Sequence, residues 1–192
     1  DAGAEAILQV SSAEIYGGGS LDYKDDGRPT KIREDDPVEP HSSYGVAKAA
    51  VDSWVQCRWK EAQTPCIALR QFNCLGERET HPYIVPEIIG QLAKQQKARV
   101  RFEKQNTCAV VKLGNNSFRD FLYAGDAVKI AVELLERGQL GEVYNLGSET
   151  GIKMYDLAKL IGKLMGFADV VVEQDAARVR PWEIWHLLAD NT

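Results

Sequence analysis

The sequence has little of what metal centres, disulfide scaffolds and membrane spans require. Its 192 residues include 4 cysteines and 3 histidines, with no C-x-x-C pair and no cluster at metal-ligand spacing. The longest apolar runs, such as residues 124–135, are broken by charged residues and are shorter than the roughly 20 apolar residues of a membrane span. Lys+Arg total 23 against 28 Asp+Glu, a formal net charge of -5, which argues against nucleic acid as the main partner. We therefore expect a reduced, cytoplasmic protein without a metal.

The remaining composition is that of a folded domain. Hydrophobic residues make up 44% and charged residues 27%, which excludes a disordered polymer or a collagen. The chain has no initiator Met and no signal peptide, and its first residues lead directly into an apolar stretch at residues 6–10. We therefore expect a processed or excised fragment.

Hydrophobic periodicity predicts alternating strands and helices. The predicted strands are residues 6–12, 66–72, 100–103, 108–113, 118–123, 142–146 and 170–173. The predicted helices are residues 44–63, with Ser42 or Ser43 as N-cap, and residues 86–97, 126–137 and 154–165. A polar loop at residues 17–43 and an irregular tail complete the chain. This alternation predicts an α/β domain with right-handed parallel crossovers.

The most informative spacing is that of Tyr44 and Lys48 on the first long helix. Residues four apart share one helix face, so the phenol and the ammonium should lie side by side. A neighbouring cation lowers the pKa of a phenol, which would make Tyr44 a usable proton-transfer group. The pair shares its stripe with Val51 and Val55, so we expect it to face inward. The alternative is a surface tyrosine beside a solvated lysine.

Ser12 and Glu14 follow the first predicted strand at its carboxyl end, where open α/β sheets bind their ligands. The Ser12 hydroxyl could hydrogen-bond both a substrate hydroxyl and the Tyr44 phenol. Glu14 could provide a second base. The alternative is that both side chains only cap loop backbone.

Several segments, taken in order, are similar to those of one family. They are residues 11–17 (S-S-A-E-I-Y-G), 34–37 (E-D-D-P), 44–48 (Y-G-V-A-K), 70–78 (R-Q-F-N-C-L-G-E-R), 119–126 (R-D-F-L-Y-A-G-D), 144–147 (Y-N-L-G), 178–181 (R-V-R-P) and 188–191 (L-A-D-N). The chain resembles the extended short-chain dehydrogenase/reductase family, in its branch of nucleotide-sugar epimerases, dehydratases and decarboxylases. The resemblance runs nearly end to end.

The resemblance implies a set of roles around a nicotinamide cofactor, NAD or NADP with NAD favoured. Tyr44 would take the proton of the sugar 4-hydroxyl while hydride leaves carbon 4, and Lys48 would tune Tyr44 and bind the nicotinamide ribose. Ser12 would orient the 4-hydroxyl. The cofactor would contact Ser11, Tyr44, Lys48 and Phe72.

The partner implied is a nucleotide-diphosphate sugar, whose diphosphate Asn73, Arg119 and Arg180 would hold. Without the resemblance, Arg119 could simply pair with Asp120 or Asp126. Arg180 could likewise pair with Glu183 on the surface.

The resemblance favours a 4,6-dehydratase, because an acid at Glu14 is typical of dehydratases and decarboxylases. A 4-epimerase and a UDP-glucuronate decarboxylase remain the alternatives. The sequence departs from the family at Ala13, where one dehydratase subgroup has a catalytic Asp. It also departs at Ser43, Leu75 and Glu77.

The expected architecture is the carboxyl-terminal part of a Rossmann-like doubly wound parallel sheet plus a small α/β substrate-binding region. Residues 1–76 would form the second half of the dinucleotide-binding domain, and residues 77–192 mainly the substrate region, with 114–147 partly returning to the sheet. The first half of the Rossmann fold, with its G-x-G-x-x-G turn, is absent. A noncatalytic remnant that at most binds nucleotide sugar is therefore a second hypothesis.

Self-association is expected for two reasons. An unpaired apolar edge beside residues 6–12 invites pairing with another chain. The family also commonly dimerises through the helix that carries the Y-x-x-x-K motif. Trp54 and Trp59 could serve that interface or the core, and we expect a homodimer or another homo-oligomer.

Overall fold

The computed structural model describes residues 3–17, 30–80, 82–101, 108–179 and 183–191. The chain divides into two compact units. Unit 1 comprises Asp1–Gly76, Arg119–Gly151 and Ile184–Thr192, and unit 2 comprises Glu77–Phe118 and Ile152–Glu183. Each unit is therefore assembled from segments that lie far apart in the sequence.

A three-stranded parallel sheet forms the centre of unit 1. Its strands are β1 (Ile7–Val10), β2 (Cys66–Gln71) and β6 (Val143–Leu146), in the order β1-β2-β6. The first five residues of β2 are all buried. A central parallel strand is covered on both faces, which explains why β2 reads in the sequence as an almost continuous apolar run.

Short elements and two helices complete unit 1. These elements are η1 (Ala13–Tyr16), α1 (Ser43–Ala62), β3 (Asn73–Leu75), β5 (Phe118–Tyr123), α3 (Ala124–Arg137) and β9 (His186–Leu187). β3 pairs in parallel with β5, and β9 lies beside β5. An isolated parallel bridge joins Ile32, in the segment before α1, to Ala189, near the end of the chain.

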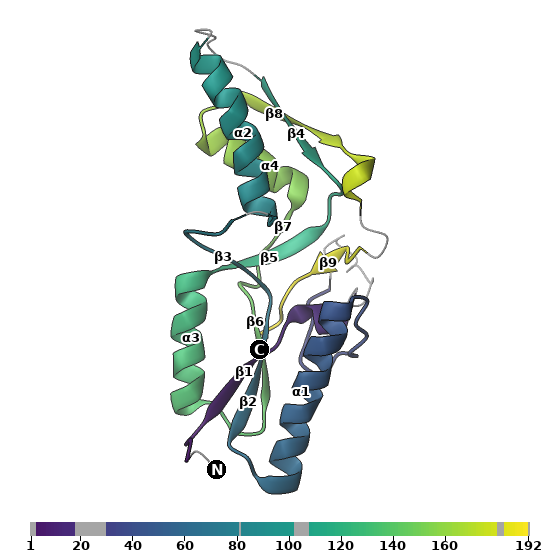
Figure 1. Ribbon diagram of the computed structural model, residues 1–192, viewed down its shortest axis with the longest axis vertical. Coiled ribbons are helices and arrows are strands. Elements are labelled where there is room, and N and C mark those ends of the chain that lie inside the picture. Colours follow the sequence, from purple (N-terminus) through teal and green to yellow (C-terminus); the bar gives the residue numbers. More distant parts are fainter. Residues whose placement is uncertain (1–2, 18–29, 81, 102–107, 180–182, 192) are drawn as a thin grey trace. The chain divides into compact units, whose positions relative to one another are not determined.

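The two helices cover opposite faces of the β1-β2-β6 sheet (Figure 1). Val55 of α1 packs in a buried cluster with Ala68, whereas Ala127 of α3 packs in another with Leu69. Because successive strand residues point to opposite faces, β2 contributes to both cores. The predicted α/β class with a parallel sheet is confirmed.

Trp59 belongs to the core of unit 1. It packs against the cluster of Val55 and Ala68, and a Cβ added to Gly141 would lie 2.1 Å from its indole ring. Trp54, by contrast, is 61% exposed. The two tryptophans therefore divide between the core and the surface.

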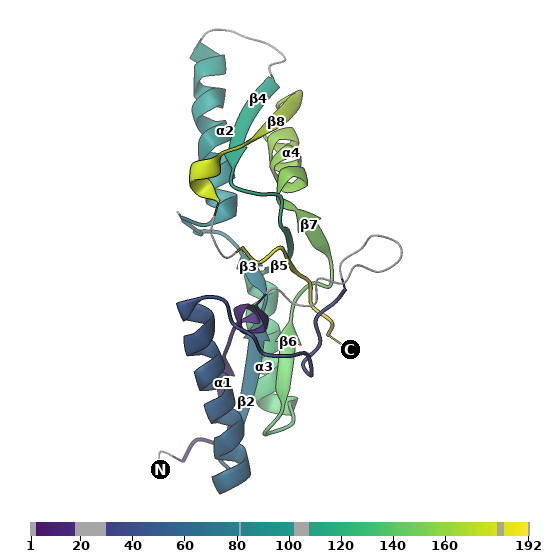
Figure 2. The ribbon, with the colours of Figure 1, turned by 90° about the vertical axis from the view of Figure 1, so that its right-hand side faces the viewer.

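Unit 2 packs two helices on one face of a strand pair. Its elements are α2 (Ile84–Arg101), β4 (Cys108–Leu113), β7 (Gly151–Lys153), which begins at the boundary with unit 1, α4 (Met154–Leu164), β8 (Asp169–Gln174) and η2 (Ala176–Arg178). β4 and β8 pair in parallel along their full lengths, and α2 and α4 lie on one face of this pair (Figures 1 and 2). Alternate residues of β4 are buried, as expected for a strand covered on one side.

The edge of β4 that faces α2 is covered by two glutamines one helical turn apart. Gln91 donates to the Lys112 carbonyl at 3.0 Å and accepts from the Lys112 amide at 2.8 Å. Gln95 makes the same pair of bonds with Val110, at 2.7 and 3.0 Å. The side-chain amides thus take the place of a neighbouring strand, which protects an edge that would otherwise invite pairing.

One of the strands predicted from the sequence is wrong, and the structure contains three strands that were not predicted. Residues 100–101, predicted to begin a strand, lie at the end of α2, and residues 102–103 lie outside the described residues. Helix propagation through the Ala-, Gln- and Lys-rich residues 93–98 explains the extension. β3, β7 and β9 were not predicted, because strands of two or three residues carry almost no periodic signal.

None of the helices in the described part of the chain combines the length and the apolar character that a bilayer span requires. Within the same residues, no three His, Cys, Asp or Glu side chains gather as potential metal ligands.

Candidate active site

The first turns of α1 bring Tyr44 and Lys48 together. Ser42 caps the helix, because its Oγ accepts a hydrogen bond from the Gly45 amide at 2.9 Å. Lys48 Nζ lies 5.8 Å from the centroid of the Tyr44 ring, so the two side chains are neighbours, as their spacing predicts. Lys48 Nζ also donates to the Val10 carbonyl at 2.8 Å. The ammonium therefore links α1 to the carboxyl end of β1.

Tyr44 faces away from the core. Its side chain is 51% exposed, and the buried residues of α1 are Gly45, Asp52 and Val55. The prediction that the pair faces inward is wrong for Tyr44, and on the predicted stripe Val51 is exposed whereas Val55 is buried. The helix turns Asp52 inward because Arg70 of β2 meets it there in a buried ion pair. Half-exposure leaves the Tyr44 phenol open to a ligand.

Ser12 and Glu14 lie at η1, the turn that follows β1. Ser12 Oγ accepts a hydrogen bond from the Glu14 amide at 3.2 Å, so Ser12 does cap this turn. Glu14 Oε2 accepts a hydrogen bond from Ser42 Oγ at 2.9 Å. The structure thus brings the carboxylate of Glu14 to the start of the helix that carries Tyr44.

Close packing fixes the distance between η1 and α1. A Cβ on Gly45 would lie 2.8 Å from the Glu14 carbonyl oxygen and 3.0 Å from Pro40 Cβ. A larger residue at Gly45 would push the turn away from the helix. Glycine at this position therefore keeps Glu14 against the first turn of α1.

Ser11, the residue after β1, has a buried hydroxyl. Its side chain is 3% exposed, and within the described residues its Oγ makes no hydrogen bond. A buried hydroxyl without a partner costs free energy, so this position suits a ligand hydroxyl. Together with Lys48 at the neighbouring Val10 carbonyl, it provides polar groups at the carboxyl end of a parallel strand. The predicted contacts of Ser11 and Lys48 with a dinucleotide cofactor remain predictions.

Phe72 and Asn73 follow β2, the next strand of the sheet. Phe72 is 4% exposed and packs in a core cluster, its ring centroid 6.5 Å from that of Tyr16. Asn73 Oδ1 is buried and, among the described residues, has no hydrogen-bond partner. Among the described residues, Ser11 and Asn73 thus have unpaired polar atoms directly after neighbouring strands. The assignments of Phe72 to the cofactor and of Asn73 to the substrate remain predictions.

Arg119 on β5 reaches the last segment of the chain. Its Nη2 donates to the Ile184 carbonyl at 2.6 Å. Its two predicted carboxylate partners have other contacts, because Asp120 accepts from backbone amides and Asp126 pairs with Lys129. Arg180 lies outside the described residues, so its predicted role and its alternative pairing with Glu183 stay predictions.

A buried polar network supports the turn that carries Glu14. The guanidinium of Arg70 binds Asp52 through two nitrogens and donates to the Tyr16 hydroxyl at 2.8 Å. Tyr16 in turn donates to Asn145 Oδ1 at 2.7 Å, and the Asn145 amide donates to Glu34 Oε1 at 2.7 Å. Burial raises the pKa of the Tyr16 phenol to about 12, against the opposing effect of Arg70. The sequence motifs contain most of these residues, but spacing alone gives no sign that they meet.

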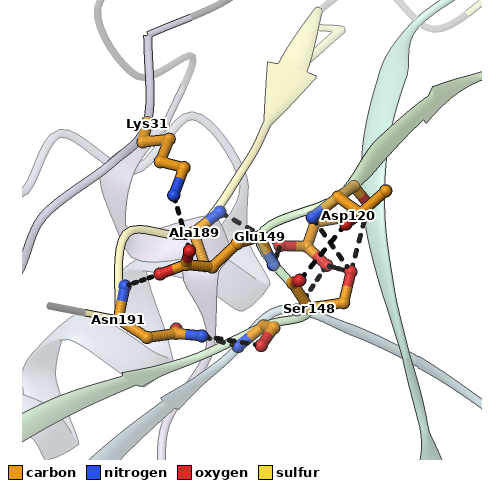
Figure 3. A network of polar contacts seen from close by, with 8 residues as sticks. Lys31, Asp120, Ser148, Glu149, Ala189 and Asn191 are labelled. Atoms are coloured by element: carbon orange, nitrogen blue, oxygen red, sulfur yellow. Dashed lines mark hydrogen bonds and ion pairs between the residues drawn. The ribbon is translucent and has the colours of Figure 1, made fainter.

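Asp120 closes a second network, shown in Figure 3. This fully buried carboxylate accepts hydrogen bonds from the Ser148 amide and hydroxyl, the Glu149 amide and the Ala189 amide. A Cβ on Gly147 would lie 2.5 Å from Asp120 Oδ2, so only glycine leaves room for this arrangement. We call this arrangement the Asp120 clasp. It holds the segment that follows Ile184 against β5.

Glu149, next to the clasp, forms an ion pair and accepts a hydrogen bond from a backbone amide. Lys31 Nζ lies 2.6 Å from Glu149 Oε2, and the Asn191 amide donates to Glu149 Oε1 at 2.8 Å. The Asn191 side chain also bonds the Gly147 backbone (Figure 3). The hydrogen bond from Lys31 is the main reason that the pKa of Glu149 is lowered.

Parallel α/β sheets bind their ligands at the carboxyl ends of the strands, and this structure places Lys48 and the Glu14 carboxylate there. Residues 1–147 match the family described as the NAD dependent epimerase/dehydratase family. The chain belongs to this family.

Individual relatives are similar over most of this chain but only part of their own. The dTDP-D-glucose 4,6-dehydratase of Mus musculus is 31% identical over 86% of this chain and 41% of the mouse protein. An ADP-L-glycero-D-manno-heptose-6-epimerase of Nitratidesulfovibrio vulgaris is 28% identical over 86% of this chain and 49% of that protein. The chain thus spans less than half the length of these relatives.

Solved structures share the fold. The dTDP-glucose 4,6-dehydratase of Bacillus anthracis in complex with NAD has a TM-score of 0.73 at 22% identity, covering 97% of this chain and 53% of its own. The UDP-N-acetylglucosamine 4-epimerase of Methanobrevibacter ruminantium has a TM-score of 0.74 at 20% identity, covering 96% and 54%. RMD from Pseudomonas aeruginosa, complexed with NADPH, gives 0.74 at 20% identity, covering 96% and 56%. The Rossmann-like architecture predicted for this chain is therefore confirmed.

Proposed function

We propose that the protein is a nucleotide-sugar 4,6-dehydratase that uses NAD or NADP, NAD being favoured. The observation that carries this proposal is the Glu14 carboxylate, held against the start of the helix that presents Tyr44 and Lys48. Dehydratase relatives at about 30% identity support the same reaction class.

Tyr44 is the base for the sugar 4-hydroxyl. Its exposed phenol, one turn from Lys48, takes the hydroxyl proton, and Ser12 orients that hydroxyl. The dinucleotide binds to Ser11, Tyr44, Lys48 and Phe72. A nicotinamide held by these residues would supply the redox chemistry, as acceptor of the hydride from carbon 4 and donor of a hydride to carbon 6.

Glu14 carries the elimination. The new 4-keto group makes the carbon 5 proton acidic, and Glu14 removes that proton and delivers it to the departing hydroxyl of carbon 6, which leaves as water. Carbon 5 then receives one proton, which balances the proton that Tyr44 took from the 4-hydroxyl. The net change is therefore the loss of one water. Ala13, 1% exposed in a core cluster, offers no second acid, so Glu14 serves as both base and acid.

The nucleotide diphosphate binds to Asn73, Arg119 and Arg180. The buried, unpaired Oδ1 of Asn73 and the contact of Arg119 with the Ile184 segment support a ligand site between β3, β5 and the last segment of unit 1. Guanidinium groups suit a diphosphate in charge and geometry.

The test is product analysis with the full-length protein and a panel of dTDP-, UDP-, GDP- and CDP-hexoses. We expect mass spectrometry to detect a 4-keto sugar that has lost one water, and Tyr44→Phe to abolish its formation. Glu14→Gln should block water loss while carbon 4 is still oxidised. Inversion at carbon 4 without water loss would instead favour a 4-epimerase. Loss of carbon dioxide from UDP-glucuronate would favour a decarboxylase.

A noncatalytic binding module is the second candidate, because these 192 residues contain no G-x-G-x-x-G turn. Calorimetric titration of this chain with dinucleotide and with nucleotide sugars separates the two. Binding of the sugar without the dinucleotide would support the binding module. Dinucleotide binding by this chain alone would count against it.

A further inference from the structure

The hydroxyl of Ser42 joins two parts of the candidate site. Its oxygen accepts the Gly45 amide at 2.9 Å, which caps α1. Its single proton is donated to Glu14 Oε2, also at 2.9 Å. One side chain therefore secures both the helix that presents Tyr44 and the carboxylate of Glu14.

This contact leaves one oxygen of Glu14 for chemistry. In the described part of the chain, Oε2 is bound by Ser42, and Oε1 has no protein partner. The bond fixes the orientation of the carboxylate and therefore the direction in which Oε1 points. A proton transfer depends steeply on such positioning.

The turn that carries Glu14 lies against the amino-terminal end of α1, a helix of 20 residues, as the close approach of Gly45 to the Glu14 carbonyl shows. This packing holds the Glu14 carboxylate within hydrogen-bond distance of Ser42.

We infer that Ser42 is a positioning residue that orients Glu14 for proton transfer at carbon 5, in addition to capping α1. The inference rests on the proposed dehydratase function. It predicts that the two tasks of Ser42 are separable, because capping needs only an acceptor whereas orienting Glu14 needs a hydroxyl donor.

Substitutions at Ser42 separate these tasks. Ser42→Thr keeps the acceptor and the donor, Ser42→Asp keeps the acceptor but has no proton to donate, and Ser42→Ala loses both. Ser43→Ala is the matched control, because Ser43 is an exposed neighbour at the start of the same helix. Only Ser42→Ala should markedly speed amide exchange at Gly45.

The chemical readout is solvent deuterium incorporation at carbon 5 of a nucleoside-diphosphate 4-keto sugar added to the full-length protein. Supplying the ketone removes the need for oxidation at carbon 4, so the assay reports the proton transfer alone. We expect Ser42→Asp and Ser42→Ala to slow exchange by about tenfold or more, and Ser42→Thr and Ser43→Ala to stay near the unmodified rate. Equal rates in Ser42→Asp and the unmodified protein would overturn the inference.

A second readout does not depend on the sugar. In a double-mutant cycle with Ser42→Ala and Glu14→Ala, the cap is lost in both backgrounds, so the coupling isolates the bond between the two side chains. We expect a coupling of about fivefold to tenfold in the unfolding equilibrium constant of this chain. Absence of coupling would refute the positioning role, whereas coupling without any carbon 5 exchange in the unmodified protein would refute the dehydratase proposal instead.

Discussion

The carboxylate of Asp52 receives two hydrogen bonds from the guanidinium of Arg70, 3.1 Å from Nε and 2.9 Å from Nη2. Both side chains are almost completely buried. Breaking such a pair leaves an uncompensated charge inside the protein, so Asp52→Ala should lower the free energy of unfolding by about 3–5 kcal/mol. Denaturant titration measures this loss. Asp126→Asn, which removes an exposed pair with Lys129, is the control and should cost far less.

Tyr16 should give the protein an alkaline limit of stability. Burial raises the pKa of its phenol to about 12 in the folded state, above the usual value near 10. A raised pKa favours the neutral phenol, so the stabilisation is complete below about pH 10 and is lost as the pH rises toward 12, by about 2 kcal/mol. Denaturant titrations between these pH values should show Tyr16→Phe losing less stability than the unmodified chain. A parallel decline in both would contradict the assignment, and Tyr83→Phe, at the surface, controls for the loss of a phenol.

Glu149 should make the Asp120 clasp sensitive to acid. The hydrogen bond from Lys31, followed by that from the Asn191 amide, lowers the pKa of Glu149. A lowered pKa stabilises the fold above the ordinary carboxyl value, and this contribution disappears as the pH falls through the folded value. The protection of the Asn191 amide from hydrogen exchange, relative to its intrinsic exchange rate at each pH, should therefore fall in acid in the unmodified chain and be low at all pH values in Glu149→Gln. Glu173→Gln, an exposed residue of unit 2, should leave this exchange unchanged.

Gln91 and Gln95 should protect β4 against pairing with other chains. Replacing both by alanine removes four hydrogen bonds and uncovers the backbone of Val110 and Lys112. We expect a lower free energy of unfolding, by about 1 kcal/mol per glutamine, and increased aggregation seen by light scattering. Lys94→Ala on the same helix, an exposed position, should change neither quantity.

Self-association through α1 is the remaining prediction. Trp54, Val46 and Val51 are exposed on this helix, and a second copy of the chain would cover them. Light scattering after size exclusion should show a dimer or a larger oligomer, and Trp54→Glu should weaken it. A clean monomer at high concentration would contradict this prediction.

The sequence was sufficient to locate the long elements. Ser42 as an N-cap and a 20-residue helical pattern predicted α1, and the buried apolar run after Pro65 predicted β2. Such elements carry strong local signals. The strands β3, β7 and β9 do not, because they exist only through pairing or contact with residues distant in the sequence.

The candidate site was predictable in part for the same reason. The contact of Tyr44 with Lys48 follows from helical spacing within one element. The exposure of Tyr44 does not follow from spacing. It depends on which face of α1 is buried, and the ion pair of Asp52 with Arg70, on another element, bears on this. Spacing likewise cannot show that Ser42 reaches Glu14, 28 positions away.

The Asp120 clasp also bears on the rate of unfolding. Its hydrogen bonds join residues 28, 29 and 69 positions apart, contacts that require long loops to close. Contacts of this kind form after the rate-limiting step when they lie outside the folding nucleus, and they then act on the unfolding barrier rather than on the refolding rate. We expect the clasp to lengthen the time for which the last segment stays in its docked position.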